Sequence, residues 1–361
     1  MSDSSKTIPA DRQAINAELA PALSAIRTNC HITDARHATD YTMCVYLLKM
    51  REYFRWERNI PYSTTLPHEE LTHWLSQRES LWEALGDASF QAIPLAGETI
   101  DPFDAGAINT HLNDLGYVYS SGYGRNMKPH FFLGKLVEQR QYNGYTLYIS
   151  GREHARDLTA PPAMSLGNSI FIRHESLRRM IWEKVEEWRW NRPENAMRRA
   201  IDCYGFETTP DQALDDMTDN EVRSVLLHEI GEVMAGEALG KDWEELLATM
   251  PHSKAEIMLR AVRDNLADAM STLPGLLDEL QPASMHFYIA NLTNMRKTLF
   301  PSLLSAYEEW DNTGNAGKLS SIISTGRDHW LHLARRIIDL CKHRGEQCQD
   351  DIVSLVEASA L

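Results

Sequence analysis

The sequence predicts an α+β protein that is predominantly α-helical, with a small antiparallel sheet inserted between helical regions. Along most of the chain, apolar residues recur at the spacing of one helix face, and Pro, Gly or Asn separate these segments. Only the region between residues 130 and 173 changes to β-prone runs, enough for about three strands. The 361 residues are sufficient for two domains, or for one large domain with an extension.

The N-terminal part is expected to be helical. Apolar residues recur at helical spacing from Ala14 to Ile26, and residues 40–58 form an aromatic-rich segment that we also expect to be a helix. Residues 67–86 begin with Pro and end with Gly, which is the usual asymmetry of a helix. A shorter helix is expected at residues 104–115.

The β-structure is expected to centre on a hairpin. Two β-prone runs between His130 and Ser150 flank Asn143 and Gly144, and Asn-Gly is the strongest short signal for a hairpin turn. Residues 150–168 are expected to be a loop, because Gly, Pro and Ser interrupt them. The stretch "SIFIR", Ser169–Arg173, is expected to be one more strand.

After Glu175 the chain is expected to be helical to its end. A capping box from Thr218 to Glu221 predicts that one of these helices starts at Asp219. The expected helices cover residues 175–191, 193–204, 219–238, 254–273, 284–311, 319–342 and 349–358.

The change in character along the chain suggests where domains meet. We predict a helical N-terminal region at residues 1–115. The remaining residues, 116–361, are predicted to form an α+β region with the sheet at 130–173 and a helical bundle.

Composition limits the classes of partner. The net charge is −15, which argues against general binding to nucleic acid or to an anionic membrane, since both need a basic face. No segment approaches the roughly 18 apolar residues of a membrane helix, and the first residues lack the apolar core of a signal peptide. We therefore expect a cytoplasmic protein with no nucleic-acid and no membrane partner; oligomerisation stays open.

Cysteine usage points to a reducing compartment. The number of cysteines is odd, and none forms a C-x-x-C pair, so neither a disulfide framework nor a cysteine zinc site is expected. The cysteines are Cys30, Cys44, Cys203, Cys341 and Cys348.

The segment "LLHEIGE" carries the first candidate chemistry. His228 and Glu232 are four residues apart, so a helix places them on one face, one turn apart, where they can bind one ion. Glu229 lies beside His228, about 100° round the helix. In H-E-x-x-H enzymes, the glutamate at this position is the general base for a metal-bound water.

A second helix, Glu256–Leu277, carries two aspartates four residues apart, Asp264 and Asp268. Asp is a poor residue for the middle of a helix, because its side chain competes for backbone hydrogen bonds. One explanation is salt bridges to Arg260 and Arg263 on the preceding turn. The other is that a carboxylate contributes to a shared ion. The sequence leaves both open.

Together, H-E-x-x-E and the following D-x-x-x-D resemble the gluzincin branch of the zincin metallopeptidases. That family has H-E-x-x-H on one helix and E-x-x-x-D on a later one. The resemblance implies that His228 is the first metal ligand, Glu229 the general base and Glu232 the second ligand. It also implies that Asp264 is the third ligand and that Asp268 orients the imidazole.

Two departures from the family pattern bear on the metal. Glu232 stands where the family has its second histidine, and Asp264 stands where it has a glutamate. One imidazole and two carboxylates suit Mn²⁺ or Fe²⁺ better than Zn²⁺, although zinc stays open. We therefore expect one divalent metal ion (Zn, Mn or Fe) and a hydrolase that uses a metal-bound water activated by Glu229. Its substrate, a small molecule or a peptide, is not identified by the sequence.

His174 is an additional candidate. It directly follows the expected strand Ser169–Arg173, at the junction with the next expected helix. It is expected to be either a further metal ligand or substrate contact, or a histidine that caps the start of the helix.

Three other functions compete with the hydrolase. A non-haem di-iron or di-manganese carboxylate oxidase needs two Glu-x-x-His motifs, and the motif helices carry none. An HD-like phosphohydrolase is suggested because "LLHEIGE" resembles the "LLHDIGK" of that class, with His174 as the only plausible earlier histidine. The last alternative is a non-catalytic helical interaction protein in which Glu232 marks a degenerate site.

Overall fold

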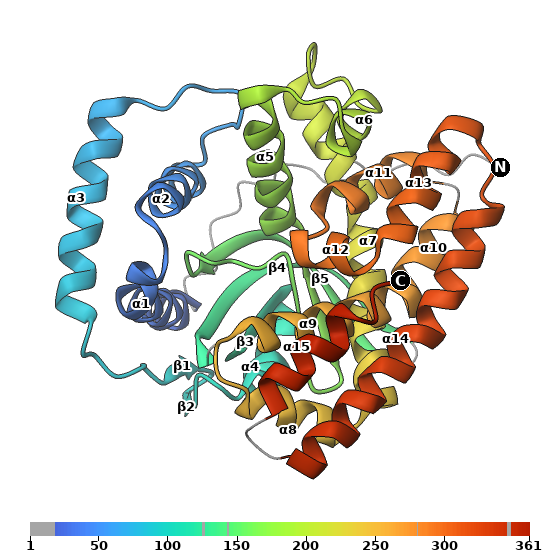
Figure 1. Cartoon of the computed structure of the whole chain (residues 1–361). Coiled ribbons are helices and arrows are strands. Elements are labelled where there is room, and N and C mark those ends of the chain that lie inside the picture. Colours follow the sequence, from blue (N-terminus) through green and yellow to red (C-terminus); the bar gives the residue numbers. More distant parts are fainter. Residues whose placement is uncertain (1–18, 125–126, 143, 280, 345–347) are drawn as a thin grey trace. The chain divides into compact units, whose positions relative to one another are not determined.

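The structure is a computed structural model that describes residues 19–124, 127–142, 144–279, 281–344 and 348–361 (Figure 1). It divides into two compact units that alternate along the chain, and each is described separately. Unit 1 consists of residues up to Ile60, Leu66–Gln139 and Ser150–Ala160. Unit 2 consists of Pro61–Thr65, Arg140–Ile149 and Pro161–Leu361.

Unit 1 is built from helices, a two-stranded antiparallel sheet and one end of a larger sheet. Its helices are α1 (Ala20–His37), α2 (Met43–Arg58), α3 (His68–Leu85) and α4 (Ala105–Leu112). The small sheet pairs β1 (Ile93–Leu95) with β2 (Glu98–Ile100). The helices expected at residues 40–58, 67–86 and 104–115 are confirmed as α2, α3 and α4. The helix expected from residue 14 is described only from Ala20, since residues 14–18 lie outside the described residues. Residues 93–100, which no expected element covered, form the two short strands.

The larger sheet has five strands in the order β3-β4-β5-β7-β6. The strands are β3 (Tyr117–Tyr123), β4 (Pro129–Tyr142), β5 (Tyr145–Arg156), β6 (Ala163–Leu166) and β7 (Ser169–Arg173). The hairpin between β4 and β5 is confirmed, and Gly144 has the left-handed φ of 87° that its turn requires. Asn143 lies outside the described residues. The strand expected at Ser169–Arg173 is also confirmed.

The expected number of about three strands is wrong, since the described part of the chain holds a five-stranded sheet and a separate pair of strands. The missed strands are short or rich in Gly and Ser, so they lack the β-branched alternation that marks a strand. Residues 150–168, expected to be a loop, hold the end of β5 and all of β6. Backbone pairing with neighbouring strands, rather than local composition, defines these segments.

Unit 2 is helical after β7, as expected, and the protein is predominantly α-helical. Its first helices are α5 (His174–Asn191), α6 (Ala196–Asp202), α7 (Pro210–Leu239), α8 (Lys241–Thr249) and α9 (Lys254–Ala267). A π-helical turn and a short helix follow, η5 (Asp268–Thr272) and α10 (Leu273–Asp278). The last are α11 (Pro282–Asn291), α12 (Asn294–Leu299), α13 (Pro301–Thr313), α14 (Gly317–Arg344) and α15 (Gln349–Glu357).

The predicted start of α7 at Asp219 is wrong, because the helix begins at Pro210. The hydroxyl of Thr218 donates to the Leu214 carbonyl 2.6 Å away, as it does inside a helix. The carboxylate of Glu221 accepts from Ser284 at 2.7 Å instead of capping the backbone. The apparent capping box is therefore an internal segment of a longer helix.

The long helix expected at residues 284–311 is divided into three. Thr293 accepts a hydrogen bond from the Arg296 amide and so caps α12, and Pro301 starts α13. The helix expected at residues 254–273 is also interrupted, since its last residues form η5.

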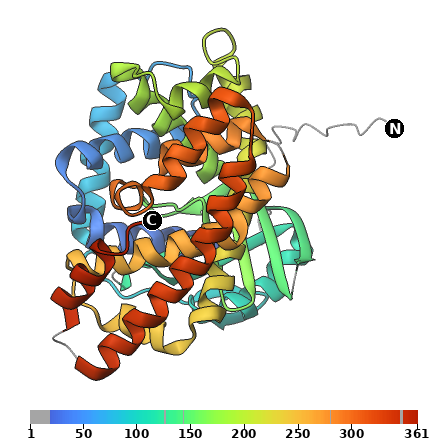
Figure 2. The ribbon, with the colours of Figure 1, turned by 45° about the vertical axis from the view of Figure 1, so that its right-hand side comes forward.

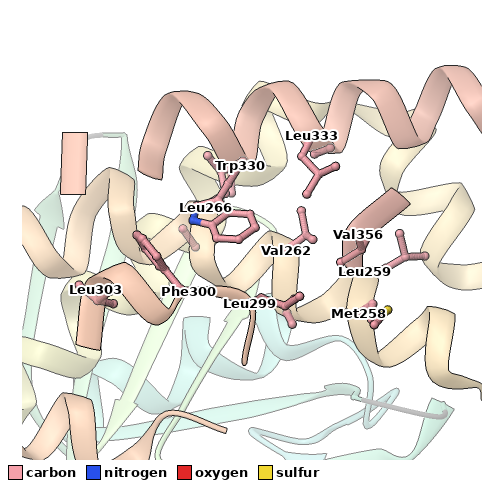
Figure 3. Close-up of a cluster of buried hydrophobic side chains, with 14 of the residues drawn as sticks. Met258, Leu259, Val262, Leu266, Leu299, Phe300, Leu303, Trp330, Leu333 and Val356 are labelled. Atoms are coloured by element: carbon pink, nitrogen blue, oxygen red, sulfur yellow. The ribbon is translucent and has the colours of Figure 1, made fainter. Parts of the chain in front are cut away.

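The main hydrophobic core of unit 2 surrounds α9. Val262 and Leu266 of this helix lie close to Leu333 and Trp330 of α14, and Leu259 lies near Val356 of α15 (Figure 3). Helix α14 packs against α9, α13 and α15, and Figure 2 shows its length from a second side. Because α9 is held on several sides, the charged residues on its remaining face have fixed positions.

Within the described ranges, no helix is long and apolar enough to span a membrane. The predicted boundary between residues 115 and 116 stays a prediction, because the compact units are defined by contacts and alternate along the chain.

Candidate functional site

Helix α7 approaches the end of α9 closely at Gly231. A Cβ atom at this position would overlap the carbonyl group of Ala267. Only a glycine allows the two backbones to come so near, and it is the reason why the motif on α7 meets the aspartates of α9 and η5. One turn before Gly231, His228 faces Asp268.

Asp268 is a fully buried carboxylate that anchors the site. Its Oδ1 accepts from His228 Nδ1 at 2.8 Å and from Thr272 Oγ1 at 2.6 Å. Its Oδ2 accepts from the Tyr288 hydroxyl at 3.0 Å and from Arg296. Burial alone would raise the pKa of this carboxyl, but the Arg296 and His228 cations hold it well below its usual range. Asp268 is therefore ionised and fixes the imidazole.

The other nitrogen of His228 faces Glu232. Nε2 lies 3.6 Å from Glu232 Oε1. Two atoms that each bind an ion at about 2.1 Å in tetrahedral geometry lie about 3.4 Å apart, so this pair has the spacing of shared ligands. Burial opposes the charged imidazolium, yet Asp268 raises the pKa of His228 to about 9, so the ring keeps a proton that a bound ion would displace.

Glu229 is buried beside this pair. Its pKa is raised to about 7, first by burial and then by the charge of Glu232. No hydrogen-bond donor to its carboxylate is present among the residues that the structure describes. A carboxylate with a pKa near neutrality is suited to accept a proton at physiological pH.

The guanidinium of Arg263 lies between the carboxylates of Glu232 and Asp264. Its Nη2 is 2.8 Å from Glu232 Oε1 and 3.5 Å from Asp264 Oδ1. Burial raises the pKa of Asp264, although Arg263 and Arg296 oppose this. The guanidinium therefore neutralises the position where an ion would bind both carboxylates.

The site is open to solvent on the side of these residues. The side chains of His228, Glu232 and Asp264 are 35 %, 26 % and 28 % exposed, whereas that of Asp268 is 0 % exposed. An ion or a small ligand could reach the first three without unfolding of the helices. In the described part of the chain, no three or more His, Cys, Asp or Glu side chains are arranged to hold a metal ion. His228 and Glu232 therefore have the spacing of two metal ligands, whereas the carboxylate of Asp264 is paired with Arg263.

The structure gathers five of the six residues singled out by sequence. His228, Glu229 and Glu232 come from α7, Asp264 from α9, and Asp268 from η5. His174 is not among them, because its Nε2 pairs with Asp219 Oδ1 at 2.7 Å. It is the first residue of α5.

Two arginines of α9 differ in their roles. Arg260 pairs with Glu256 and not with Asp264, the partner that its four-residue spacing suggests. Arg263 is the partner of Asp264, and it also binds Glu232 across the helix interface.

Sequence reasoning missed Tyr288 and Arg296, which complete the shell around Asp268. They lie on α11 and α12, and nothing in their local sequence marks them. Arg296 Nε also donates to Asn265 Oδ1 at 2.9 Å. Only the tertiary packing of these short helices against α9 brings them to the aspartate.

The fold and site define a mostly helical protein with a histidine–carboxylate cluster where α7 meets α9. The chain belongs to a family of unknown function (DUF6866): the model of the family's N-terminal domain matches residues 21–173, and that of its C-terminal domain matches residues 178–359. No curated protein matches the chain, and no solved structure does so. The cluster lies within the C-terminal family domain.

Proposed function

We propose that unit 2 is a hydrolase dependent on one divalent metal ion, with His228, Glu232 and Asp264 as ligands and Glu229 as general base. One observation carries this proposal: His228 donates Nδ1–H to buried Asp268 and turns Nε2 toward Glu232. Histidines that ligate metals usually donate their other ring N–H to a carboxylate or carbonyl in this way, which fixes the tautomer and orientation of the ring.

The charges of the cluster also support a cation. The charges of three carboxylates, Glu229, Glu232 and Asp264, act on His228, while Arg296 compensates Asp268. When His228 is neutral, as a ligand must be, Arg263 and Arg296 are left as cations beside the carboxylates of Glu229, Glu232, Asp264 and Asp268. A divalent ion would offset the excess negative charge.

The residues of the chain would divide the chemistry between them. Asp268 keeps the imidazole in one tautomer, and Glu229 accepts a proton from a water molecule at neutral pH. A bound divalent ion would supply Lewis acidity and lower the pKa of that water toward about 7. One imidazole with two carboxylates favours Mn²⁺ or Fe²⁺, with Zn²⁺ as the alternative.

Arg263 has to leave the carboxylates for the full ligand set to form. An ion at Glu232 and Asp264 would compete with the guanidinium for the same oxygen atoms. A displaced Arg263 would remain beside the site, where its planar donors suit a carboxylate or phosphate group of a substrate. We therefore propose anionic small molecules or peptides as the substrate class.

A second function is favoured by the position of Arg263 itself. If the guanidinium permanently replaces a metal, the cluster is a structural ion-pair network in a non-catalytic interaction protein. The 2.8 Å contact to Glu232 supports this alternative.

An Arg263→Met variant distinguishes the two functions, with Arg260→Met on the same helix as the matched control. The measurement is the melting temperature with and without Mn²⁺, Fe²⁺ or Zn²⁺, after treatment with a chelator. The hydrolase proposal expects tighter metal binding by Arg263→Met, and about 2.7 kcal/mol of stabilisation at a hundredfold excess over Kd. If the variant is destabilised and no ion restores it, Arg263 is a structural cation and the hydrolase proposal is wrong.

A further inference from the structure

Two of the cysteines form a close pair at the C-terminal end of unit 2. The Sγ atoms of Cys341, on α14, and Cys348, immediately before α15, lie 2.7 Å apart. Atoms that are only in packing contact are about 3.5–4.0 Å apart. The two thiols are thus closer than packing requires, although the chain places six residues between them.

The two thiols differ in their access to solvent. Cys348 is 3 % exposed and belongs to the hydrophobic core around α9, whereas Cys341 is half-buried. A reagent from solvent would therefore reach Cys341 first, with Cys348 in position behind it. Cys30 instead donates to the Phe131 carbonyl. Among the described residues, no other cysteine lies beside the exposed Cys44 or Cys203.

We propose that Cys341 and Cys348 are a reversible dithiol–disulfide pair that is oxidised by a small-molecule disulfide such as glutathione disulfide. The Cys341 thiolate attacks one sulfur of the oxidant, which forms a mixed disulfide and releases one glutathione thiolate. Cys348 then loses its proton to solvent and attacks Cys341 Sγ, which releases the second glutathione. Two protein thiols are oxidised, and one glutathione disulfide is reduced to two thiols.

The environment of Cys341 determines the rate of the first step of this exchange. Burial, together with the neighbouring Cys348, raises the pKa of the Cys341 thiol to about 12. Little thiolate is present at neutral pH, so the first step should be slow there and accelerate as the pH rises. The pair therefore fits slow equilibration with the redox state of its surroundings.

A bond between these residues would fix the last helix of the chain. Ile352 and Val356 of α15 belong to the core that includes Leu259 of α9. Figure 3 shows Val356 next to Leu259. The disulfide would join α15 covalently to the end of α14, which restricts the unfolded chain and stabilises this packing. This inference is independent of the proposed metal site.

The test uses the full chain, reduced and then equilibrated with glutathione disulfide. After acid quenching and alkylation, each molecule with the internal bond should carry two alkyl groups fewer than the reduced protein, because Cys341 and Cys348 no longer offer free thiols. Trypsin cleaves after Lys342 and Arg344, so the two cysteines separate into different peptides unless the bond holds them together. The expected result is a linked Cys341–Cys348 peptide and a melting temperature several degrees higher than that of the reduced protein.

Two sets of variants serve as controls. Cys341→Ser and Cys348→Ser should each abolish the linked peptide and the rise in melting temperature, while Cys44→Ser and Cys203→Ser should keep both. Peptide mapping of the unmodified chain gives an answer even if Cys348→Ser fails to fold. Glutathione bound to Cys44 and Cys203, with Cys341 and Cys348 still alkylated under oxidising conditions, would overturn the proposal.

Discussion

The Nδ1 atom of His228 lies 2.8 Å from Oδ1 of Asp268 and joins the motif helix to a fully buried carboxylate. Because Asp268 also accepts from Thr272, Tyr288 and Arg296, its position is fixed from several helices. The hydrogen bond to Asp268 therefore fixes the orientation of the imidazole, with Nε2 toward Glu232.

Asp268→Asn should strongly destabilise unit 2. The substitution leaves the buried Arg296 without its ionic partner, and breaking a buried pair in this way costs about 3–5 kcal/mol. Urea unfolding measures the loss. The control is Asp264→Asn, whose side chain is 28 % exposed and whose loss should cost at most about 1 kcal/mol. Equal losses in the two variants would contradict the anchoring role of Asp268.

Glu229→Gln should stabilise the metal-free protein at neutral and higher pH. The pKa of Glu229 is about 7 in the folded state against 4.5 for an unperturbed glutamate. As the pH rises from 4.5 to 7, the unfolded state loses its proton first, so the wild-type protein loses stability over this window. The amide of the variant does not titrate. Between pH 4.5 and pH values above 7, the difference in free energy of unfolding between variant and wild type should therefore shift in favour of the variant by up to about 3 kcal/mol.

Urea unfolding at pH 5 and pH 8, in the presence of a chelator, checks this prediction for Glu229. Glu237→Gln, at an exposed position on the same helix, is the control and should show no such pH-dependent gain. The same difference between Glu229→Gln and wild type at both pH values would show that Glu229 is not a buried acid with a raised pKa.

Gly231→Ala and Gly236→Ala should have opposite effects, although both lie on α7. At Gly231 a Cβ atom would overlap the backbone of Ala267, so we expect a loss of about 1–3 kcal/mol. At Gly236 no atom lies within 4 Å of such a Cβ, so alanine should stabilise the helix by about 0.4–1 kcal/mol. Thermal unfolding measures both; a tolerated alanine at Gly231 would contradict the close approach of α7 to the end of α9.

Unit 1 should lose stability in mild acid because of His31. Burial, followed by the charge of Arg78, lowers the pKa of His31 to about 4. Above pH 6.5 both states are neutral; as the pH falls from 6.5 toward 4, only the unfolded state gains a proton, and up to about 3 kcal/mol is lost. His31→Gln should reduce the loss of stability between pH 7 and pH 5. The pKa of His154 is also lowered to about 4, so this histidine should still cause part of the loss of stability in the variant.

The exposed His73→Gln serves as the control for His31 and should leave the acid slope unchanged. Calorimetry at the two pH values gives the comparison. A His31→Gln variant that loses as much stability in acid as wild type would mean that the folded protein does not hold His31 in its neutral form.

The sequence predicts helices well here because their periodicity is local. His228 and Glu232 share a face simply because they are four residues apart, and the same holds for Asp264 and Asp268. The short strands β1, β2 and β6 could not be predicted in this way, since their backbone pairing decides them.

The rest of the site depends on contacts between distant segments. Nothing local marks Tyr288 or Arg296, which reach Asp268 from α11 and α12. The partner of Asp264 also could not be chosen from spacing, because Arg260 and Arg263 are both near in sequence. The crossing of α7 and α9 selects Arg263, since it can bind Glu232 at the same time.

Elemental analysis of the purified protein tests the metal centre most directly. The wild type, prepared without chelator and offered Mn²⁺, Fe²⁺ and Zn²⁺, is compared with His228→Ala and with His174→Ala as the matched control. About one equivalent of a divalent metal is expected in wild type and in His174→Ala, and its loss is expected in His228→Ala. No metal in any of the three, or equal metal in wild type and His228→Ala, would contradict the metal centre.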